Sequence, residues 1–117
     1  MVKMVATLVR KPGMSPEQFR KHWKEVHGPL VLSLPEMTRH IRRYVQNIPT
    51  GMDMPADATG GAPIDGVAEM VFESFEAMQQ CFAEPSYLAR VRPDEEAFLD
   101  LAKCQVVVVE ERVLIGA

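Results

Sequence analysis

The stretch VKMVATLVRKPGMSPEQFRKHW (residues 2–23) contains a strand, a break and the start of a helix, and it decides the fold. Residues 2–9 are apolar at almost every position and rich in β-branched side chains, which is typical of a strand covered on both faces. The RKPG that follows breaks this pattern. Ser15 then fits a helix N-cap, Pro16 fits the first helical position, and Gln18 completes a capping box.

Three amphipathic stretches predict helices. The first, behind the capping box, has an apolar stripe at helical spacing formed by Phe19, Trp23, Val26 and Leu30. Ser74 fits the cap of the second helix, and Pro85 ends it. Pro93 opens a short third helix whose first turn contains the acidic residues Asp94, Glu95 and Glu96. Negative charge there is favoured by the helix dipole.

Strands are predicted for four segments, 2–9, 40–48, 66–73 and 105–115. The resulting order, β-α-β-β-α-(α)-β, contains two halves that each look like a βαβ unit. It predicts an α+β domain of the ferredoxin-like type that spans residues 1–117, with a four-stranded antiparallel sheet and its helices on one side. Residues 49–64, rich in Pro and Gly, form a long loop that either closes over a site or only connects the two halves.

Helices on one side leave the other face of the sheet without a cover. A strand with one uncovered face alternates apolar with polar residues. Residues 2–9 and 106–109 instead have apolar side chains at both odd and even positions. Burying about four additional apolar side chains would contribute roughly 6–12 kcal/mol. We therefore expect a homodimer in which the same face of a second copy covers this one, so that two sheets form a dimeric α+β barrel.

The composition is that of a globular domain and excludes several function classes. The chain has 117 residues, of which 47% are hydrophobic and 25% charged, and its net charge is −3. This acidic balance, without a basic cluster, argues against nucleic acid and anionic membranes as partners, and no apolar run reaches the roughly 20 residues of a membrane span. The N-terminus lacks an export signal, and Cys81 and Cys104 are expected to be reduced thiols, so we expect a cytoplasmic protein.

Two histidines on the first helix are the strongest candidates for chemistry. His22 lies three residues after Phe19 and His27 lies four after Trp23, so both border the apolar stripe. A neutral imidazole in an apolar cleft can transfer protons near pH 7. His27 is interpreted as catalytic, or alternatively as a helix-end histidine that bonds nearby carbonyls. His22 is interpreted as a substrate contact, or alternatively as packing at the solvent edge.

Four further residues complete the candidate site. Tyr44 is a catalytic candidate if its hydroxyl points under the helices toward His27, and a half-buried structural tyrosine is the alternative. Glu69 interrupts an apolar strand, where a buried carboxylate is costly without a partner. It either pairs with Arg42 or Arg43 across strands or lines a polar substrate site. Asn47 and Trp23 are the remaining candidate substrate contacts.

The sequence gives no sign of a cofactor. It contains no phosphate loop, nucleotide fingerprint or cluster of metal ligands, and Gly60-Gly61 lacks the strand-turn-helix context of a phosphate site. A Cys/His nucleophilic pair has little support, because nothing brings a base to either cysteine. We therefore expect chemistry without a metal or an organic cofactor.

A family resemblance is carried by four segments: PGMSPEQFRKHWKEVHGPLV (12–31), RRYVQN (42–47), DGVAEMVFESFEAM (65–78) and EERVLIG (110–116). Together they resemble the EthD family, which belongs to the dimeric α+β barrel superfamily of ferredoxin-like proteins. The combination FRxHWxxxHGPL with RYVQN is the most specific part. The resemblance covers nearly all of the chain except residues 49–64.

This resemblance implies a homodimer with a ligand cleft between sheet and helices. His27 matches the histidine of the HGPL motif, and Tyr44 matches the tyrosine of RYVQN. The family and its close relatives include a protein encoded with ether-degradation genes and cofactor-free enzymes that act on muconolactones and aromatic polyketides. We therefore expect a cofactor-independent isomerase, dehydratase or cyclase for a small hydrophobic metabolite, cyclic or aromatic and oxygenated. The alternative is a non-catalytic metabolite-binding or accessory protein of a catabolic oxidising system.

Overall fold

The structure is a computed structural model that describes residues 1–50 and 64–116, so most of the predicted loop 49–64 lies outside the described residues. The strands are β1 (Val2–Leu8), β2 (Ile41–Asn47), β3 (Gly66–Phe72) and β4 (Gln105–Val109). The helices before β2 are α1 (Pro16–His22), the π-helix η1 (Trp23–His27), α2 (Gly28–Leu32) and α3 (Pro35–Thr38). Those after β3 are α5 (Phe75–Ala83), the π-helix η2 (Tyr87–Val91) and α6 (Arg92–Phe98).

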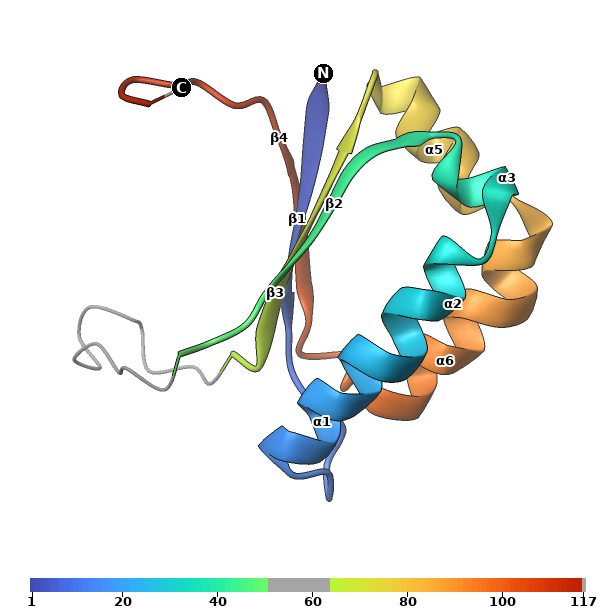
Figure 1. Cartoon of the computed structure of the whole chain (residues 1–117), viewed down its shortest axis with the longest axis vertical. Coiled ribbons are helices and arrows are strands. Elements are labelled where there is room, and N and C mark those ends of the chain that lie inside the picture. The colour runs from blue at the N-terminus through green and yellow to red at the C-terminus, as the bar shows by residue number, and fades with distance from the viewer. Residues whose placement is uncertain (51–63, 117) are drawn as a thin grey trace.

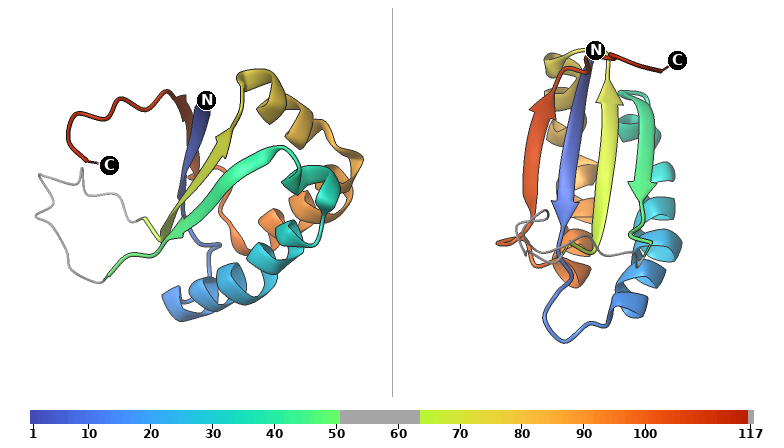
Figure 2. Two further views of the ribbon diagram at one scale, coloured as in Figure 1. Left: turned by 45° about the horizontal axis from the view of Figure 1, so that its top comes forward. Right: turned by 90° about the vertical axis from the view of Figure 1, so that its left-hand side faces the viewer.

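The strands form one antiparallel sheet in the order β2-β3-β1-β4. The helices of the described residues all lie on one side of this sheet (Figure 1). Two further views show that none of these helices covers the opposite face (Figure 2). This arrangement confirms the predicted ferredoxin-like α+β fold.

Two predicted boundaries are wrong. The last strand ends at Val109 rather than at 115, because β4 pairs only with β1 and Val109 is already opposite Lys3, near the start of β1. The chain beyond β4 leaves the sheet on the side away from the helices (Figure 1). The acidic helix does not open at Pro93, because the chain is already helical from Tyr87. Pro93 instead occupies the first turn of α6, where proline is tolerated.

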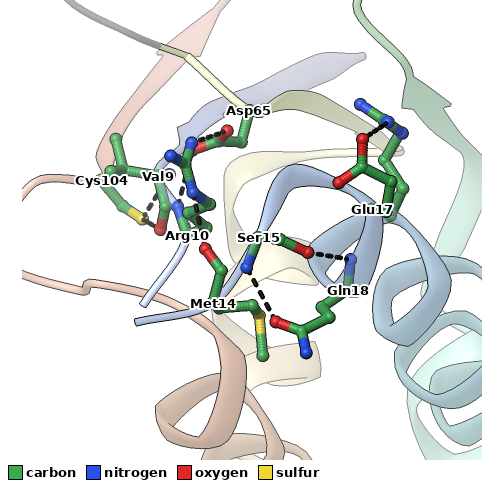
Figure 3. Close-up of polar contacts among 9 residues, drawn as sticks. Val9, Arg10, Met14, Ser15, Glu17, Gln18, Asp65 and Cys104 are labelled. Atoms are coloured by element: carbon green, nitrogen blue, oxygen red, sulfur yellow. Dashed lines mark hydrogen bonds and ion pairs between the residues drawn. The ribbon is translucent and has the colours of Figure 1, made fainter. Parts of the chain in front are cut away.

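The entry into α1 confirms the predicted capping box. Ser15 Oγ accepts a hydrogen bond from the Gln18 backbone N–H (3.1 Å), and Gln18 Oε1 accepts one from the Ser15 N–H (2.8 Å) (Figure 3). Beside it, the Arg10 guanidinium donates to the Met14 carbonyl and to Asp65 Oδ1, both at 2.8 Å (Figure 3). Arg10 therefore links the end of β1, the turn before α1 and the start of β3.

The buried stripe of the first helical segment differs from the predicted one at two positions, because His27 replaces Val26 and Val31 replaces the half-buried Leu30. Phe19 and Trp23 are 0% and 1% exposed, as predicted, but Val26 is 47% exposed and His27 takes its place at 7%. The cause is η1, because a π-helical turn contains more residues than an α-helical one. Inward positions therefore recur every four residues through His27 to the buried Val31.

The sheet face without helices carries valines from both central strands. Val5 on β1 and Val67 and Val71 on β3 lie at the positions that alternate with the helix-facing core residues. On the edge strand β4, the adjacent Val106 and Val107 are 63% and 54% exposed, although they point to opposite faces. The protomer thus leaves a substantial apolar part of its sheet in water, which is the feature from which a dimer is expected.

Candidate active site between the helices and the sheet

Two imidazoles and one carboxylate connect the first helical segment to α6. His22 Nε2 lies 2.7 Å from Asp94 Oδ1, and His27 Nδ1 lies 2.9 Å from Asp94 Oδ2. An ionised carboxylate only accepts hydrogen bonds, so each imidazole donates its N–H to Asp94. In the neutral ring this leaves Nε2 of His27 and Nδ1 of His22 as unprotonated nitrogens that can take up a proton.

The ring of Phe98 holds both imidazoles in place. It stacks on His22 with centroids 4.6 Å apart and packs against the tilted ring of His27 at 5.1 Å. Phe98 is fully buried, and the Asp94 side chain is 12% exposed. Hydrogen bonds in such surroundings are stronger than in water. The cluster is therefore rigid and largely shielded from solvent.

Tyr44 lies on the helix-facing side of β2, opposite the buried Met70. Burial raises the pKa of its phenol, the nearby negative charge of Glu95 raises it further, and a hydrogen bond with Gln46 partly opposes both effects. Tyr44 therefore stays protonated at neutral pH and can donate a hydrogen bond. The Gln46 Nε2 also donates to the Trp23 carbonyl (3.0 Å), which ties β2 to η1.

A second carboxylate in the helix layer is held by a tyrosine. The Tyr87 hydroxyl donates to Glu95 Oε1 at 2.7 Å, and Arg92 Nη1 lies 3.6 Å from the same oxygen. Burial and this hydrogen bond raise the pKa of Tyr87 to about 12. Because Glu95 follows Asp94 directly, α6 presents two adjacent carboxylates, one to the histidines and one into the surroundings of Tyr44.

Tyr44 lines two adjoining cavities that open between α2 and β2. One, of about 260 Å³, is lined by Lys24, Gly28, Pro29, Leu32, Tyr44 and Gln46. The other, of about 230 Å³, is lined by Leu32, Thr38, Ile41, Arg42, Arg43 and Tyr44. A separate hollow of about 510 Å³ along the outer side of α1 includes His22. His27 lines none of the three, and its neighbour Gly28 forms the wall on its side.

The structure brings only some of the predicted site residues together. His22 and His27 meet at Asp94, and Tyr44 lies on the same side of the sheet, but the polar neighbours of Tyr44 are Gln46 and Glu95 rather than His27. Trp23 is 1% exposed and packs in the core against Phe19, with ring centroids 5.6 Å apart.

Asn47 and Glu69 lie on the opposite, helix-free face of the sheet. The Glu69 carboxylate is 3.0 Å from Lys3 Nζ and accepts a hydrogen bond from Asn47 Nδ2 at 2.8 Å. These two contacts lower the pKa of Glu69. Of the arginines expected to pair with Glu69, Arg42 instead bonds Glu73 at 2.7 Å. Both residues are therefore far better placed for contact with a second copy than for contact with a ligand beside the histidines.

Sequence reasoning missed Asp94 as the partner of both histidines and assigned it to a helix dipole. The signal that could have found it is its spacing, because Asp94 lies four residues before Phe98 and therefore on the same face of α6 as this buried ring. An acidic side chain in line with a buried aromatic residue needs a partner. Histidines on the neighbouring helix are the partners that the chain supplies.

Neither cysteine is suited to nucleophilic chemistry. Burial raises the pKa of Cys81 to about 11. Burial also raises the pKa of Cys104, whose sulfur lies 3.3 Å from the backbone nitrogen of Val9. Both thiols are therefore protonated near pH 7.

Within residues 1–50 and 64–116, no group of three or more His, Cys, Asp or Glu side chains is arranged to hold a metal ion. Over the same residues, no helix has the length and apolar character needed to span a membrane.

Comparison with known proteins finds relatives along most of the chain. The model of the EthD domain matches residues 11–102. Dehydratase ustZ from Ustilaginoidea virens is 32% identical over 105 residues, which cover 85% of this chain and 75% of that protein. The conidial pigment biosynthesis dehydratase EthD from Metarhizium robertsii is 26% identical over 112 residues, covering 90% of this chain and 78% of that protein.

Solved structures share the fold at lower identity. An EthD family protein from Bacillus halodurans C-125 superposes with a TM-score of 0.70 at 21% identity, covering 96% of this chain and 99% of that one. A protein of unknown function from Bacteroides fragilis, described as dimeric and ferredoxin-like, gives a TM-score of 0.64 at 13% identity and covers 94% of this chain and 95% of that one.

Proposed function

Since this chain belongs to the EthD family, we propose that it is a cofactor-independent dehydratase, or a closely related isomerase or cyclase, for a small cyclic or aromatic oxygenated metabolite. The names of the curated relatives favour dehydration among these reactions. The observation that carries the proposal is Asp94, which accepts a hydrogen bond from His27 Nδ1 and so leaves Nε2 as the basic nitrogen.

The proposed reaction uses His27 twice. Nε2 removes a proton from the carbon next to a substrate carbonyl, and the electron pair of the broken C–H bond forms an enolate. The enolate then expels the hydroxyl group of the adjacent carbon, a C=C bond forms, and the leaving hydroxide takes the proton from the imidazolium as water. Asp94 stabilises the imidazolium between the two steps. For both residues to act on one substrate, the substrate must extend from the cavities of Tyr44 past Gly28 to His27. Tyr44 would then donate a hydrogen bond to the enolate oxygen, since its raised pKa keeps the phenol protonated.

The test is turnover without added cofactor. The purified protein is incubated with a β-hydroxy ketone on a cyclic or aromatic framework in deuterium oxide, and both loss of water and deuterium uptake next to the carbonyl are followed by NMR. The proposal expects both signals to depend on the amount of protein. Saturable binding without exchange or water loss would contradict it and identify a metabolite-binding protein instead.

Asp94→Asn is expected to lower kcat roughly 10²-fold, because an amide can present its N–H₂ to His27 and thereby misplace the imidazole. KM should change little, since Asp94 is proposed to act through His27 and not on the substrate. Steady-state kinetics check this, with Glu96→Gln as the matched control because Glu96 is an exposed acid on the same helix. An Asp94→Asn variant with kcat equal to that of the control would remove Asp94 from the mechanism.

We further propose that two copies pack through their helix-free sheet faces. The half-buried Val5, Val67 and Val71 and the exposed Val107 of this face support the proposal, as does the dimeric description of the Bacteroides fragilis neighbour. The ionic group of Lys3, Glu69 and Asn47 lies on the same face and would be sequestered with it.

Light scattering is expected to give a mass of twice 13.1 kDa for the wild-type protein. Val71→Lys should shift this toward the monomer, because residue 71 lies opposite Lys3 and Arg43 in the sheet, so a further positive charge on the buried face would be desolvated beside like charges. Leu32→Lys is the matched control, since Leu32 is 67% exposed on the helix side. A wild-type protein that scatters as a monomer at micromolar concentration would contradict the dimer.

A further inference from the structure

The π-helix places a lysine at the mouth of the cavity beside Tyr44. The inward-facing residues recur every four positions, at Trp23, His27 and Val31. The residue after each of them belongs to a second row, which consists of Lys24, Gly28 and Leu32. All three line the cavity of about 260 Å³ together with Tyr44 and Gln46 of β2. The row therefore faces the edge strand, and its only ionisable member is Lys24.

Residue 28, in the lining of the cavity, has little room for a side chain. A Cβ on Gly28 would lie 3.2 Å from Gln46 Nε2 and 3.4 Å from the Trp23 carbonyl oxygen. Without it, β2 and η1 approach closely enough for the Gln46 amide to bond that carbonyl. Gln46 is thereby held in position beside Tyr44, which lies two residues earlier on the same face of β2 and lines the same cavity.

The cavity of about 260 Å³ has one basic residue in its lining, Lys24. Over the described part of the chain, Lys24 forms no ion pair, and no acidic residue lines this cavity or the adjoining one. The adjoining cavity adds Arg42 and Arg43 to its lining, but Arg42 is paired with Glu73 at 2.7 Å and the charge of Arg43 acts on Glu69, so Lys24 is the cation on which the argument depends. The remaining walls are apolar, from Pro29 and Leu32. An apolar slot with a protonated phenol on one wall and an unpaired ammonium at its mouth is suited to a flat molecule that carries a carboxylate.

We propose that this cavity binds the carboxylate-bearing end of an aromatic or cyclic metabolite, with the Lys24 ammonium and the Tyr44 hydroxyl as the two donors to the carboxylate or to an adjacent carbonyl. The inference rests on the proposed function in one respect, because the Tyr44 hydroxyl that donates to the enolate oxygen is also the donor in this cavity. It adds that the substrate is an organic acid and that Lys24 determines this specificity.

The experiment compares two probes of equal shape, 2-naphthoate and 2-naphthamide, by isothermal titration calorimetry and by NMR of the 15N-labelled protein. The carboxylate is expected to bind at least about tenfold more tightly than the amide, and to shift the backbone signals of Lys24, Gly28 and Gln46. Lys24→Met should abolish the preference and Lys24→Arg should keep it. Lys21→Met, which removes a charge on the same helical segment outside this cavity, should leave it unchanged.

Equal binding of the two probes, or a preference that survives in Lys24→Met, would overturn the inference. Signals that shift around His22 and Val26 would also overturn it, because they would place the acid in the hollow along α1 instead. These outcomes leave the proposed function intact if a neutral β-hydroxy ketone is still turned over. Conversely, carboxylate-selective binding without any turnover would support the Lys24 site and contradict the dehydratase.

Discussion

His27→Ala is expected to lower turnover about 10²–10⁴-fold, the range that a positioned general acid–base group contributes. The nitrogen proposed to take up the proton is lost, whereas Asp94 and the rest of the fold remain. His27 is 7% exposed, so the alanine leaves a small void and the unfolding temperature should also fall. Activity is therefore measured well below that temperature, and light scattering verifies that the mass of the assembly is unchanged.

His27→Gln separates chemistry from packing. Its side-chain amide can still donate to Asp94, as His27 Nδ1 does at 2.9 Å, but it offers no basic nitrogen. The glutamine variant should therefore recover stability without recovering turnover. His22→Gln serves as the comparison on the other side of the same carboxylate, and a loss below about tenfold is expected because the mechanism gives His22 no proton to transfer and the glutamine amide can still donate to Asp94. A fully active His27→Ala protein would reject the mechanism.

The fold could be predicted from the sequence because its signals are local. The capping box of Ser15 and Gln18, the continuous apolar strand 2–9 and the cap at Ser74 each depend on residues within a few positions of one another. The exposed Val26 shows the limit of such patterns. Helical periodicity assumes α-helical turns, and one π-helical turn moved the buried position to His27.

The candidate site was harder to predict because its contacts join distant parts of the chain. His27 and Asp94 are 67 residues apart, and only the packing of α6 against η1 brings them together. Glu69 illustrates the second difficulty. The alternation of side chains along a strand shows which residues share a face with Glu69. It does not show which of the two faces the helices cover. The pairing of Glu69 with Lys3 and Asn47 places it on the uncovered one.

Trp23→Ala is expected to destabilise the protein by about 3–5 kcal/mol, the usual cost of removing a large buried aromatic side chain. Trp23 is 1% exposed, contacts the ring of Phe19 and closes over Gly66. A loss of this size is a large part of the roughly 5–15 kcal/mol that holds a domain folded. Urea unfolding followed by circular dichroism measures it, with Leu32→Ala as the exposed control. A loss under about 1 kcal/mol would contradict a core role and return Trp23 to the predicted substrate contacts.

Gly66 provides an independent check on the same packing. A Cβ at this position would lie 2.6 Å and 2.8 Å from Cζ3 and Cη2 of the Trp23 ring, which is rigid and enclosed. Gly66→Ala alone should therefore cost about 1–3 kcal/mol through overpacking. Trp23→Phe removes both clashing atoms, so the double variant should be more stable than the sum of the single effects predicts. Strict additivity would mean that the two residues do not touch, and the close approach of β3 to η1 would then be wrong.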